Sequence, residues 1–397
     1  MSEAREIECD VVVIGGGVAA LWSANALRAD GRSVVVLSNS PIGEGQSLAA
    51  QGVIHGGLKY AVAGKLTDSS EALADMPARW LAAMKGEGQI DLRGAALLSD
   101  HQVMWSLPNV VSQVFGFFGS KAVRGRSAAI PREQYPEAFD SAEYRGRLFR
   151  IEEPVVDPVS TMEALFRGVE ETTHQVDWGR TAHLVSGADG VEAIRLTPPD
   201  GPEATLRASR YVFAAGAGNR DLLTAIGRER PAMQLRPLHQ LVIRKPDLPD
   251  FFSVCIGSGP KPPLVSTTHT DSEGRRLWYI GGDIAEKAGV ERDEAAQIEE
   301  GKRQFARWMP WIDLAGAEWF TTRSTRAEPH TGSGDRPPGA FCRIDGNVLV
   351  TWPTKLALAP DLADQVIALC PGASSPGPTP LLPLPRPPLG KAPWDLP

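Results

Sequence analysis

Residues 10–29 join a short apolar run to a cluster of glycines and then to a segment of helical composition, Val18 to Ala29. Asp10-Val-Val-Val-Ile14 is β-branched and apolar, which predicts a buried strand. The next six residues, Gly15 to Ala20, match G-x-G-x-x-G/A. Small residues at these positions allow a tight turn, the approach of a pyrophosphate and close helix packing. The sequence therefore predicts a dinucleotide site at a helix N-terminus, with contacts from Gly15, Gly17, Val18 and Ala19.

A second apolar run, Ser33 to Leu37, follows this helix. Strand, helix and strand in this order predict a parallel βαβ unit. An acidic residue commonly ends the second strand of such a unit and binds the adenosine ribose. Ser38 stands in that place here, with Asn39 after it, so only neutral hydrogen bonds to a ribose are expected.

Length, charge and cysteine spacing narrow the functional classes. The 397 residues suffice for two or three domains, and a net charge of -7 argues against nucleic acid or an anionic membrane as partner. No apolar run is long enough to span a bilayer, and the N-terminus lacks an apolar signal core, so we expect a cytoplasmic protein. The four cysteines lie far apart, which predicts neither a disulfide framework nor a zinc site, and no metal is expected.

Further elements follow from periodicity and turn signals. Helices are expected at residues 69–84, 159–171, 293–308 and 362–369. Strands are expected at residues 183–196 and 264–280, each as a hairpin, and at residues 211–215, 235–243 and 348–352. Pro77 is expected to kink the first of these helices.

The glycine-rich segment after the βαβ unit carries a family resemblance. Gly45-Gln-Ser47-Leu-Ala-Ala-Gln51-Gly-Val-Ile-His55-Gly-Gly-Leu-Lys59-Tyr60 resembles the flavin loop of FAD-dependent glycerol-3-phosphate dehydrogenases. Related loops occur in glycine oxidase, D-amino-acid oxidase and L-2-hydroxyglutarate oxidase, which share the glutathione-reductase type 2 FAD fold. The resemblance implies FAD as cofactor, bound in this loop by Ser47, Leu48, Gln51, Gly52, His55 and Gly56.

Four later segments match the same family in the same order. They are Val156-Asp157-Pro158, Tyr211 to Gly216, Trp319 to Arg323, and Thr354 to Ala363. The second resembles a flavin motif in which a strand ends in Ala-Gly, and the last resembles a Gly-Lys-Leu-Thr-Thr segment. The resemblance therefore adds five residues to the FAD site: Ala215, Gly216, Thr354, Lys355 and Leu356.

The resemblance and the βαβ unit together predict an α/β fold. A Rossmann-like FAD-binding domain with a parallel sheet is expected beside a second α+β domain built on a large mixed or antiparallel sheet. The FAD-binding domain is expected at residues 1–85, 150–228 and 330–370, and the substrate-binding domain at residues 86–149 and 229–329. Residues 371–397 are expected to form a Pro-rich tail without a core of its own.

An anionic substrate needs a fixed cation, and a guanidinium binds carboxylate or phosphate through two hydrogen bonds. Arg323 stands at the family's substrate arginine, and Arg326 is the alternative. The resemblance also places Lys59 and Tyr60 at the substrate, and Lys355 near the flavin, where a cation would stabilise the reduced ring. For both lysines the alternative is a solvated surface position.

Three polar residues are candidates for substrate handling: His55, His239 and Gln240. A base that titrates near neutral pH would help to remove a hydroxyl proton. The resemblance implies a histidine at about the position of Gln240, and His239 is its neighbour. His239 is therefore a candidate base or a structural residue, and His55 is expected to pack against the flavin.

The leading hypothesis is an FAD-dependent oxidase or dehydrogenase that removes a hydride from a small anionic amine or hydroxy compound. Amino acids, 2-hydroxy acids and glycerol-3-phosphate-like compounds all fit, and glycerol-3-phosphate dehydrogenase proper is one alternative. Another is a flavin-bound sensor or binding protein without turnover, and a third is a colourless nicotinamide-dependent dehydrogenase. Oxygen, a quinone and a carrier protein all stay open as electron acceptor.

Overall fold

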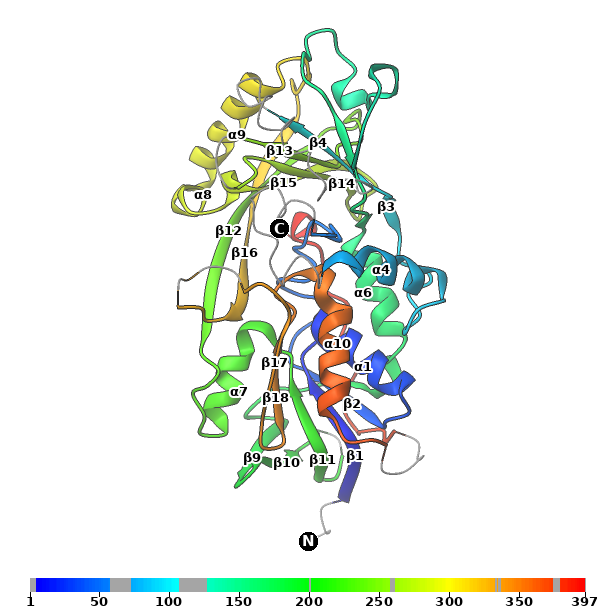
Figure 1. Ribbon diagram of the computed structural model, residues 1–397. Coiled ribbons are helices and arrows are strands. Elements are labelled where there is room, and N and C mark those ends of the chain that lie inside the picture. The colour runs from blue at the N-terminus through cyan, green and yellow to red at the C-terminus, as the bar shows by residue number, and fades with distance from the viewer. Residues whose placement is uncertain are drawn as a thin grey trace.

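The computed structural model describes residues 5–57, 73–106, 127–199, 201–257, 261–332, 334, 337–373 and 379–396. These residues build two layered regions, each around an eight-stranded sheet. In Figure 1 the first sheet occupies the lower half of the molecule and the second the upper half, with the C-terminus near their junction.

The first sheet is mainly parallel. Its strand order is β17-β18-β11-β1-β2-β8, with β10 beside β11 and β9 beside β10. The strands β8, β2, β1, β11 and β18 run parallel, whereas β17, β10 and β9 are antiparallel to their neighbours. Their bounds are β1 Arg5–Ile14, β2 Val34–Ser38, β8 Thr173–Gln175, β9 Ala182–Gly187, β10 Gly190–Leu196, β11 Ala204–Phe213, β17 Phe341–Asp345 and β18 Val348–Trp352.

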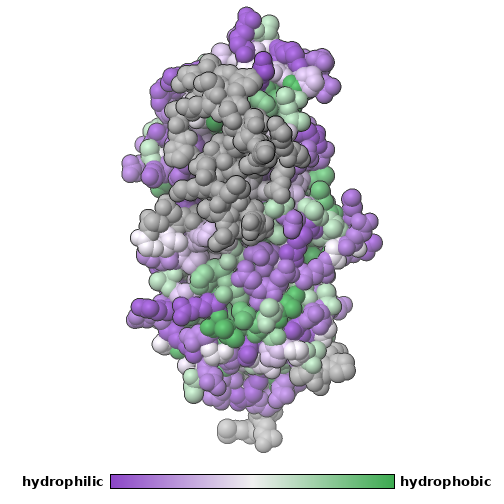
Figure 2. Space-filling model, viewed as in Figure 1, coloured by the Kyte–Doolittle hydropathy of each residue, from purple (hydrophilic) through white to green (hydrophobic). Residues whose placement is uncertain are grey.

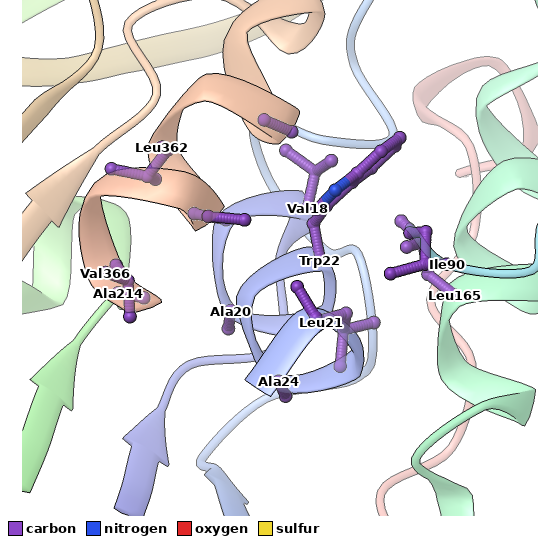
Figure 3. Close-up of a cluster of buried hydrophobic side chains, with 14 of the residues drawn as sticks. Val18, Ala20, Leu21, Trp22, Ala24, Ile90, Leu165, Ala214, Leu362 and Val366 are labelled. Atoms are coloured by element: carbon purple, nitrogen blue, oxygen red, sulfur yellow. The ribbon is translucent and has the colours of Figure 1, made fainter. Parts of the chain in front are cut away.

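Helix α1 (Val18–Ala29) is buried along most of its length because it packs between the sheet and three other helices. Figure 3 shows Leu362 and Val366 on one side of it and Ile90 and Leu165 on the other. The Trp22 ring stacks at a tilt on Trp80, with 4.5 Å between centroids. The three helices that pack on α1 are α4 Met76–Lys85, α6 Pro158–Arg167 and α10 Ala359–Leu369.

The second sheet is mixed, with the order β16-β12-β15-β14-β13-β4-β6-β5. All neighbours are antiparallel except β13 and β4. Helix α9 (Glu294–Trp308) covers one face, and the Asp293 side chain caps it by accepting from Ala296 N at 2.8 Å. The strand bounds are β4 Gln102–Ser106, β5 Ser127–Ala129, β6 Phe149–Ile151, β12 Met233–Arg244, β13 Ser253–Ile256, β14 Val265–Thr270, β15 Arg276–Gly281 and β16 Glu318–Pro329.

Short elements complete the described chain. Strands β3 (Leu97–Ser99) and β7 (Val155–Val156) pair with each other. The short helices are α7 Asn219–Ala225 and α8 Ala288–Glu291, and the 3₁₀ turns are η2 Arg132–Gln134, η3 Glu137–Phe139, η4 Glu170–Thr172, η5 Gly216–Gly218, η6 Asp283–Ala285, η7 Leu356–Leu358 and η8 Pro393–Asp395. Among the helices that the structure describes, none has the length and apolar character needed to cross a membrane. On the face in Figure 2, hydrophilic side chains predominate at both ends and apolar ones gather in the lower half.

The predicted fold class is confirmed by these two sheets, and the predicted helix at Val18–Ala29 has the same bounds in the structure. Pro77 does not kink α4, because it lies in the first turn, where no backbone N–H is needed. Strand β11 begins at Ala204, earlier than expected, because polar residues alternate with buried ones in its first half. The domain boundaries stay a prediction, although strands of the two sheets do alternate along the chain.

The C-terminal segment, residues 379–396, is irregular apart from η8, but it packs on both regions. Thr379 Oγ1 accepts from Val34 N at 3.2 Å, and Arg244 Nη2 donates to Trp394 O at 3.1 Å. The Trp394 ring stacks on His269, with 4.6 Å between centroids. Burial lowers the pKa of His269 to about 4, so a neutral ring faces the indole. The segment is therefore packed into the core of the protein and is not a free tail.

The substitution Trp394→Ala is expected to destabilise the protein by about 3–5 kcal/mol, since it opens a cavity against His269 and Tyr279. Denaturant unfolding of the FAD-loaded protein measures this loss. Leu396→Ala is the matched control, because Leu396 is 56% exposed and its truncation should change the free energy of unfolding by less than about 0.5 kcal/mol. Equal effects of the two substitutions would contradict a core role for this segment.

Candidate functional site

A cavity of about 1110 Å³ lies between the two sheets. Its volume slightly exceeds the range of about 300–1,000 Å³ typical of small-molecule sites. The first region contributes Gly15 to Ala19, Asn39, Ser40, residues from Glu44 to His55, Ala214 to Ala217 and Thr351 to Leu356. The second sheet and its loops contribute polar residues, among them Arg236, Gln240, Lys261, Glu286, Ser324 and Arg326.

The turn between β1 and α1 forms one end of the cavity. Gly15 has φ of +138°, and a Cβ there would stand 2.4 Å from Ala214 O, so only glycine fits. The backbone N of Val18 donates to Ser47 Oγ at 3.0 Å. The neighbouring first-turn N–H groups have no acceptor within the helix. The predicted residues Gly15, Gly17, Val18 and Ala19 therefore all line the cavity.

Ser38 does not reach the cavity, although the sequence predicted a ribose contact for it. Its side chain is buried, and its Oγ donates to Ser40 O at 2.8 Å. A Cβ on Gly16 would meet this Oγ at 2.5 Å, so Ser38 fills the space beneath the glycine turn. Asn39 does line the cavity, as predicted, and Ser40 joins it there.

The loop that resembles a flavin loop is fastened to both regions. Gln51 Nε2 donates to Val265 O at 2.9 Å and to Tyr279 O at 3.0 Å. His55 Nδ1 lies 2.9 Å from Glu153 Oε2, and Glu153 Oε1 accepts from Gly56 N at 3.0 Å. Of the predicted loop residues, four line the cavity, namely Ser47, Gln51, Gly52 and His55; Leu48 and Gly56 lie behind it.

The two later motifs lie at the cavity wall. Ala215 and Gly216 line it after β11, and Asn219 Oδ1 accepts from Ala215 N at 2.8 Å. Thr354, Lys355 and Leu356 line it after β18, where Thr354 has φ of +60°. The Lys355 residue is only 8% exposed, which excludes the solvated-surface alternative. Lys59 and Tyr60, predicted to face the substrate, lie outside the described residues.

Arg323 and His239 point away from the cavity. Because side chains alternate along a strand, Leu238 and Gln240 face the cavity and His239 faces helices α8 and α9. His239 Nδ1 lies 2.9 Å from Gly289 O, and its Nε2 lies 2.8 Å from Thr321 Oγ1. Arg323, its partner in register, donates to Val290 O and Arg292 O. Arg323, the first candidate for the substrate arginine, is therefore placed wrongly, and of the two roles left open for His239 its contacts favour the structural one.

Of the two arginines considered for the substrate, the one that lines the cavity is the alternative, Arg326, three residues further along β16. An odd separation reverses the face of a strand, which explains why Arg326 and Arg323 point in opposite directions. Arg236, the partner of Arg326 in register, also lines the cavity. Arg236 and Gln240 are four residues apart on β12, so their side chains share a face of the strand. The alternation of side chains along a strand that contains Gln240 would therefore have identified Arg236 as a cavity residue.

Glu286 joins these arginines and was missed by sequence reasoning, because the loop after β15 carries no motif. Its Oε1 accepts from Arg326 Nη2 at 2.8 Å and lies 3.6 Å from Arg236 Nη2. Its other oxygen bonds Lys261 Nζ. Burial opposes ionisation of Glu286, but the hydrogen bond from Lys261 and the charge of Arg326 outweigh it and lower its pKa to about 2.

Residues 10–349 match the family described as FAD dependent oxidoreductase, DAO. The chain is also 43% identical over 400 residues to the FAD-dependent oxidoreductase PA4991 of Pseudomonas aeruginosa, covering 99% of each chain. The chain belongs to this family. It is an FAD-dependent oxidoreductase, and FAD is its cofactor. Among the described residues, no group of three or more acidic, histidine or cysteine side chains could hold a metal ion.

Several solved structures share the fold. The crystal structure of PA4991 superimposes with a TM-score of 0.82 at 38% identity, covering 99% of each chain. Glycine oxidase from Geobacillus kaustophilus gives a TM-score of 0.63 at 16% identity over 95% of this chain and 99% of that one. L-α-glycerophosphate oxidase from Mycoplasma pneumoniae, solved with FAD bound, gives a TM-score of 0.66 at 12% identity, over 94% of this chain and 97% of that one.

The residues of the cavity fit FAD. The glycine turn excludes side chains where a pyrophosphate would approach, and the α1 N-terminus offers N–H groups and positive potential. Asn39 and Ser40 provide neutral hydrogen-bonding groups near this end, and the segments at Gln51 and Thr354 extend the wall toward the second sheet. The assignment of individual FAD contacts stays a prediction.

The substitution Gly15→Ala is expected to weaken FAD binding at least about tenfold, since its Cβ would collide with Ala214 O and displace the turn. Fluorescence titration of the apoprotein with FAD measures the dissociation constant. Gly179→Ala is the control, because Gly179 also has positive φ (+86°) but open space around its Cβ. If both variants retained FAD equally after desalting, the tight turn would not be essential to the site.

Proposed function

We propose that this oxidoreductase acts on a small anionic amine or hydroxy compound, with hydride transfer from the carbon that bears the nitrogen or oxygen. When bound, FAD supplies the hydride acceptor. The observation that carries this proposal is the set of cations on the second-sheet side of the cavity: Arg236, Lys261 and Arg326. A fixed guanidinium at a cavity wall is suited to a carboxylate or phosphate.

The chain's other cavity residues support this assignment. Ser324 Oγ donates to Gln240 Oε1 at 3.0 Å, which fixes the Gln240 amide at the same wall as Arg326. Lys355 lies on the opposite side, after β18, and is the cation we assign to the flavin end. Glycine oxidase and L-α-glycerophosphate oxidase share this fold, and their names indicate an amino acid as the substrate of the first and a glycerol phosphate as that of the second.

An anaerobic screen tests the substrate class. The purified holoenzyme is mixed with amino acids, 2-hydroxy acids and glycerol phosphates, and flavin absorbance near its visible maximum is followed. Loss of absorbance with members of one class identifies the reductant. If no compound of these classes bleaches the flavin, the proposed substrate class is wrong, and a role without turnover gains support.

Arg326→Ala is expected to raise the KM or Kd for the anionic substrate by about tenfold or more, because a charged hydrogen bond is lost at a half-buried wall. Arg323→Ala is the matched control on the same strand, and should leave these constants within about twofold, since Arg323 faces the α8 side. Steady-state kinetics and substrate titration provide both numbers. A larger effect at Arg323 would return the substrate contact to the other face of β16.

A further inference from the structure

The charged groups at the second-sheet end of the cavity balance one another. Arg236 and Arg326 are matched by Glu286 and Glu328, and all four side chains are less than a fifth exposed. Lys261 and Asp283, which are more exposed, add one charge of each sign. The described residues therefore provide this end with separate positive and negative groups rather than with an excess of positive charge.

The two carboxylates of this cluster differ in position. Glu328 is 1% exposed and does not line the cavity; it accepts from Arg236 Nη1 and Gln234 Nε2, both at 3.0 Å. Glu286 lines the cavity itself, beside Arg326 and Lys261. Glu328 is thus positioned to hold Arg236, whereas Glu286 presents a carboxylate to whatever enters.

We infer that Glu286 is a specificity-determining residue that favours zwitterionic amino acids over hydroxy acids and phosphate monoesters. The substrate's carboxylate would pair with Arg326, and its nitrogen would donate to Glu286. This inference rests on the proposed function and deepens it, because it chooses among the substrate classes that the cations alone admit.

The chemistry of the three classes explains the choice. A hydrogen bond from an ammonium to a carboxylate is charge-assisted, and is about twice as strong as one between neutral groups. A hydroxy acid offers only a neutral donor to Glu286. A phosphate monoester carries up to two negative charges at neutral pH, and a nearby carboxylate repels it. A substrate with one positive and one negative pole is the best match to this wall.

The side chain of Glu286 acts here as a hydrogen-bond acceptor and not as a base. Three cations surround it, and its low pKa means that it stays ionised throughout the neutral range. The proton that leaves the substrate nitrogen is therefore not assigned to it. Its expected contribution is to substrate selection, which separates it from a residue that sets the rate for every substrate equally.

Glu286→Gln tests the inference, with Glu286→Asp as the variant that keeps the charge. Rates of anaerobic flavin reduction are measured with glycine, alanine enantiomers and sarcosine, and with glycolate and lactate as hydroxy counterparts. Calorimetry on the oxidised holoenzyme measures the Kd of acetate and of inorganic phosphate, neither of which can reduce the flavin. Glu299→Gln is the control, since Glu299 also pairs with a lysine but its side chain lies on the exposed face of α9.

For the wild type and Glu299→Gln, amines are expected to reduce the flavin faster than their hydroxy counterparts. In Glu286→Gln this preference should fall about tenfold, and the affinity for inorganic phosphate relative to acetate should rise about tenfold. Glu286→Asp should keep most of the preference. If Glu286→Gln kept the wild-type ratios in both measurements, or if the wild type preferred hydroxy acids or the phosphate, the inference would be wrong.

Failure of the proposed function gives a different result. If no compound reduces the flavin of any variant, the proposed substrate class fails. Calorimetry still decides the role of Glu286, because a change in the ratio of phosphate to carboxylate affinity in Glu286→Gln does not depend on turnover. An unchanged ratio there would overturn the inference by itself.

Discussion

Twelve consecutive residue pairs join β12 to β16, from Met233 with Pro329 to Arg244 with Glu318. Side chains alternate between the two faces of a strand, so this unbroken register places Arg236 and Arg326 on the cavity face and His239 with Arg323 on the face toward α8 and α9. A slip of the edge strand β16 by one residue would turn its side chains to the opposite face, while β12 would stay in place through its pairing with β15. The cavity would then lose Arg326. The chemistry of the site therefore depends on strand pairing before it depends on any individual side chain.

The same sheet also fixes the loop that resembles a flavin loop. Gln51 reaches two carbonyls of neighbouring strands, β14 and β15, and the hydroxyl of Tyr279 donates to Ala49 O at 3.3 Å. Gln46 Oε1 accepts from Ala327 N on β16 at 3.0 Å. Each such hydrogen bond contributes about 1 kcal/mol net to stability, and a buried donor or acceptor left without a hydrogen bond costs more than that. The cofactor loop and the substrate wall are consequently held in one fixed arrangement.

Local sequence patterns predicted the region around the first, mainly parallel sheet more completely than the region around the second, mixed sheet. The glycine turn and the Val18–Ala29 helix follow from steric and periodic rules that act within a few residues. A family motif, in contrast, locates a functional residue only to within one to three positions. On a strand, an offset of one or three residues reverses the face, and Arg323 and His239 both face away from the cavity. The sequence carried no signal for Glu286, because it lies in a loop, where hydrophobic residues show no period. The residues that pair with Glu286 also come from other segments of the chain.

A buried network of opposite charges is a costly choice for stability alone, because desolvation offsets much of the attraction between the charges. Glu328 would suffice to pair with Arg236, and a wall without Glu286 would present more positive charge to an anion. In the role that we infer for it, Glu286 lowers the affinity for simple anions, because its carboxylate pairs with Arg326 and Lys261. It gains discrimination in return, since only a ligand that brings its own positive pole recovers the lost attraction. Specificity at this wall thus comes from a repulsive group placed among attractive ones.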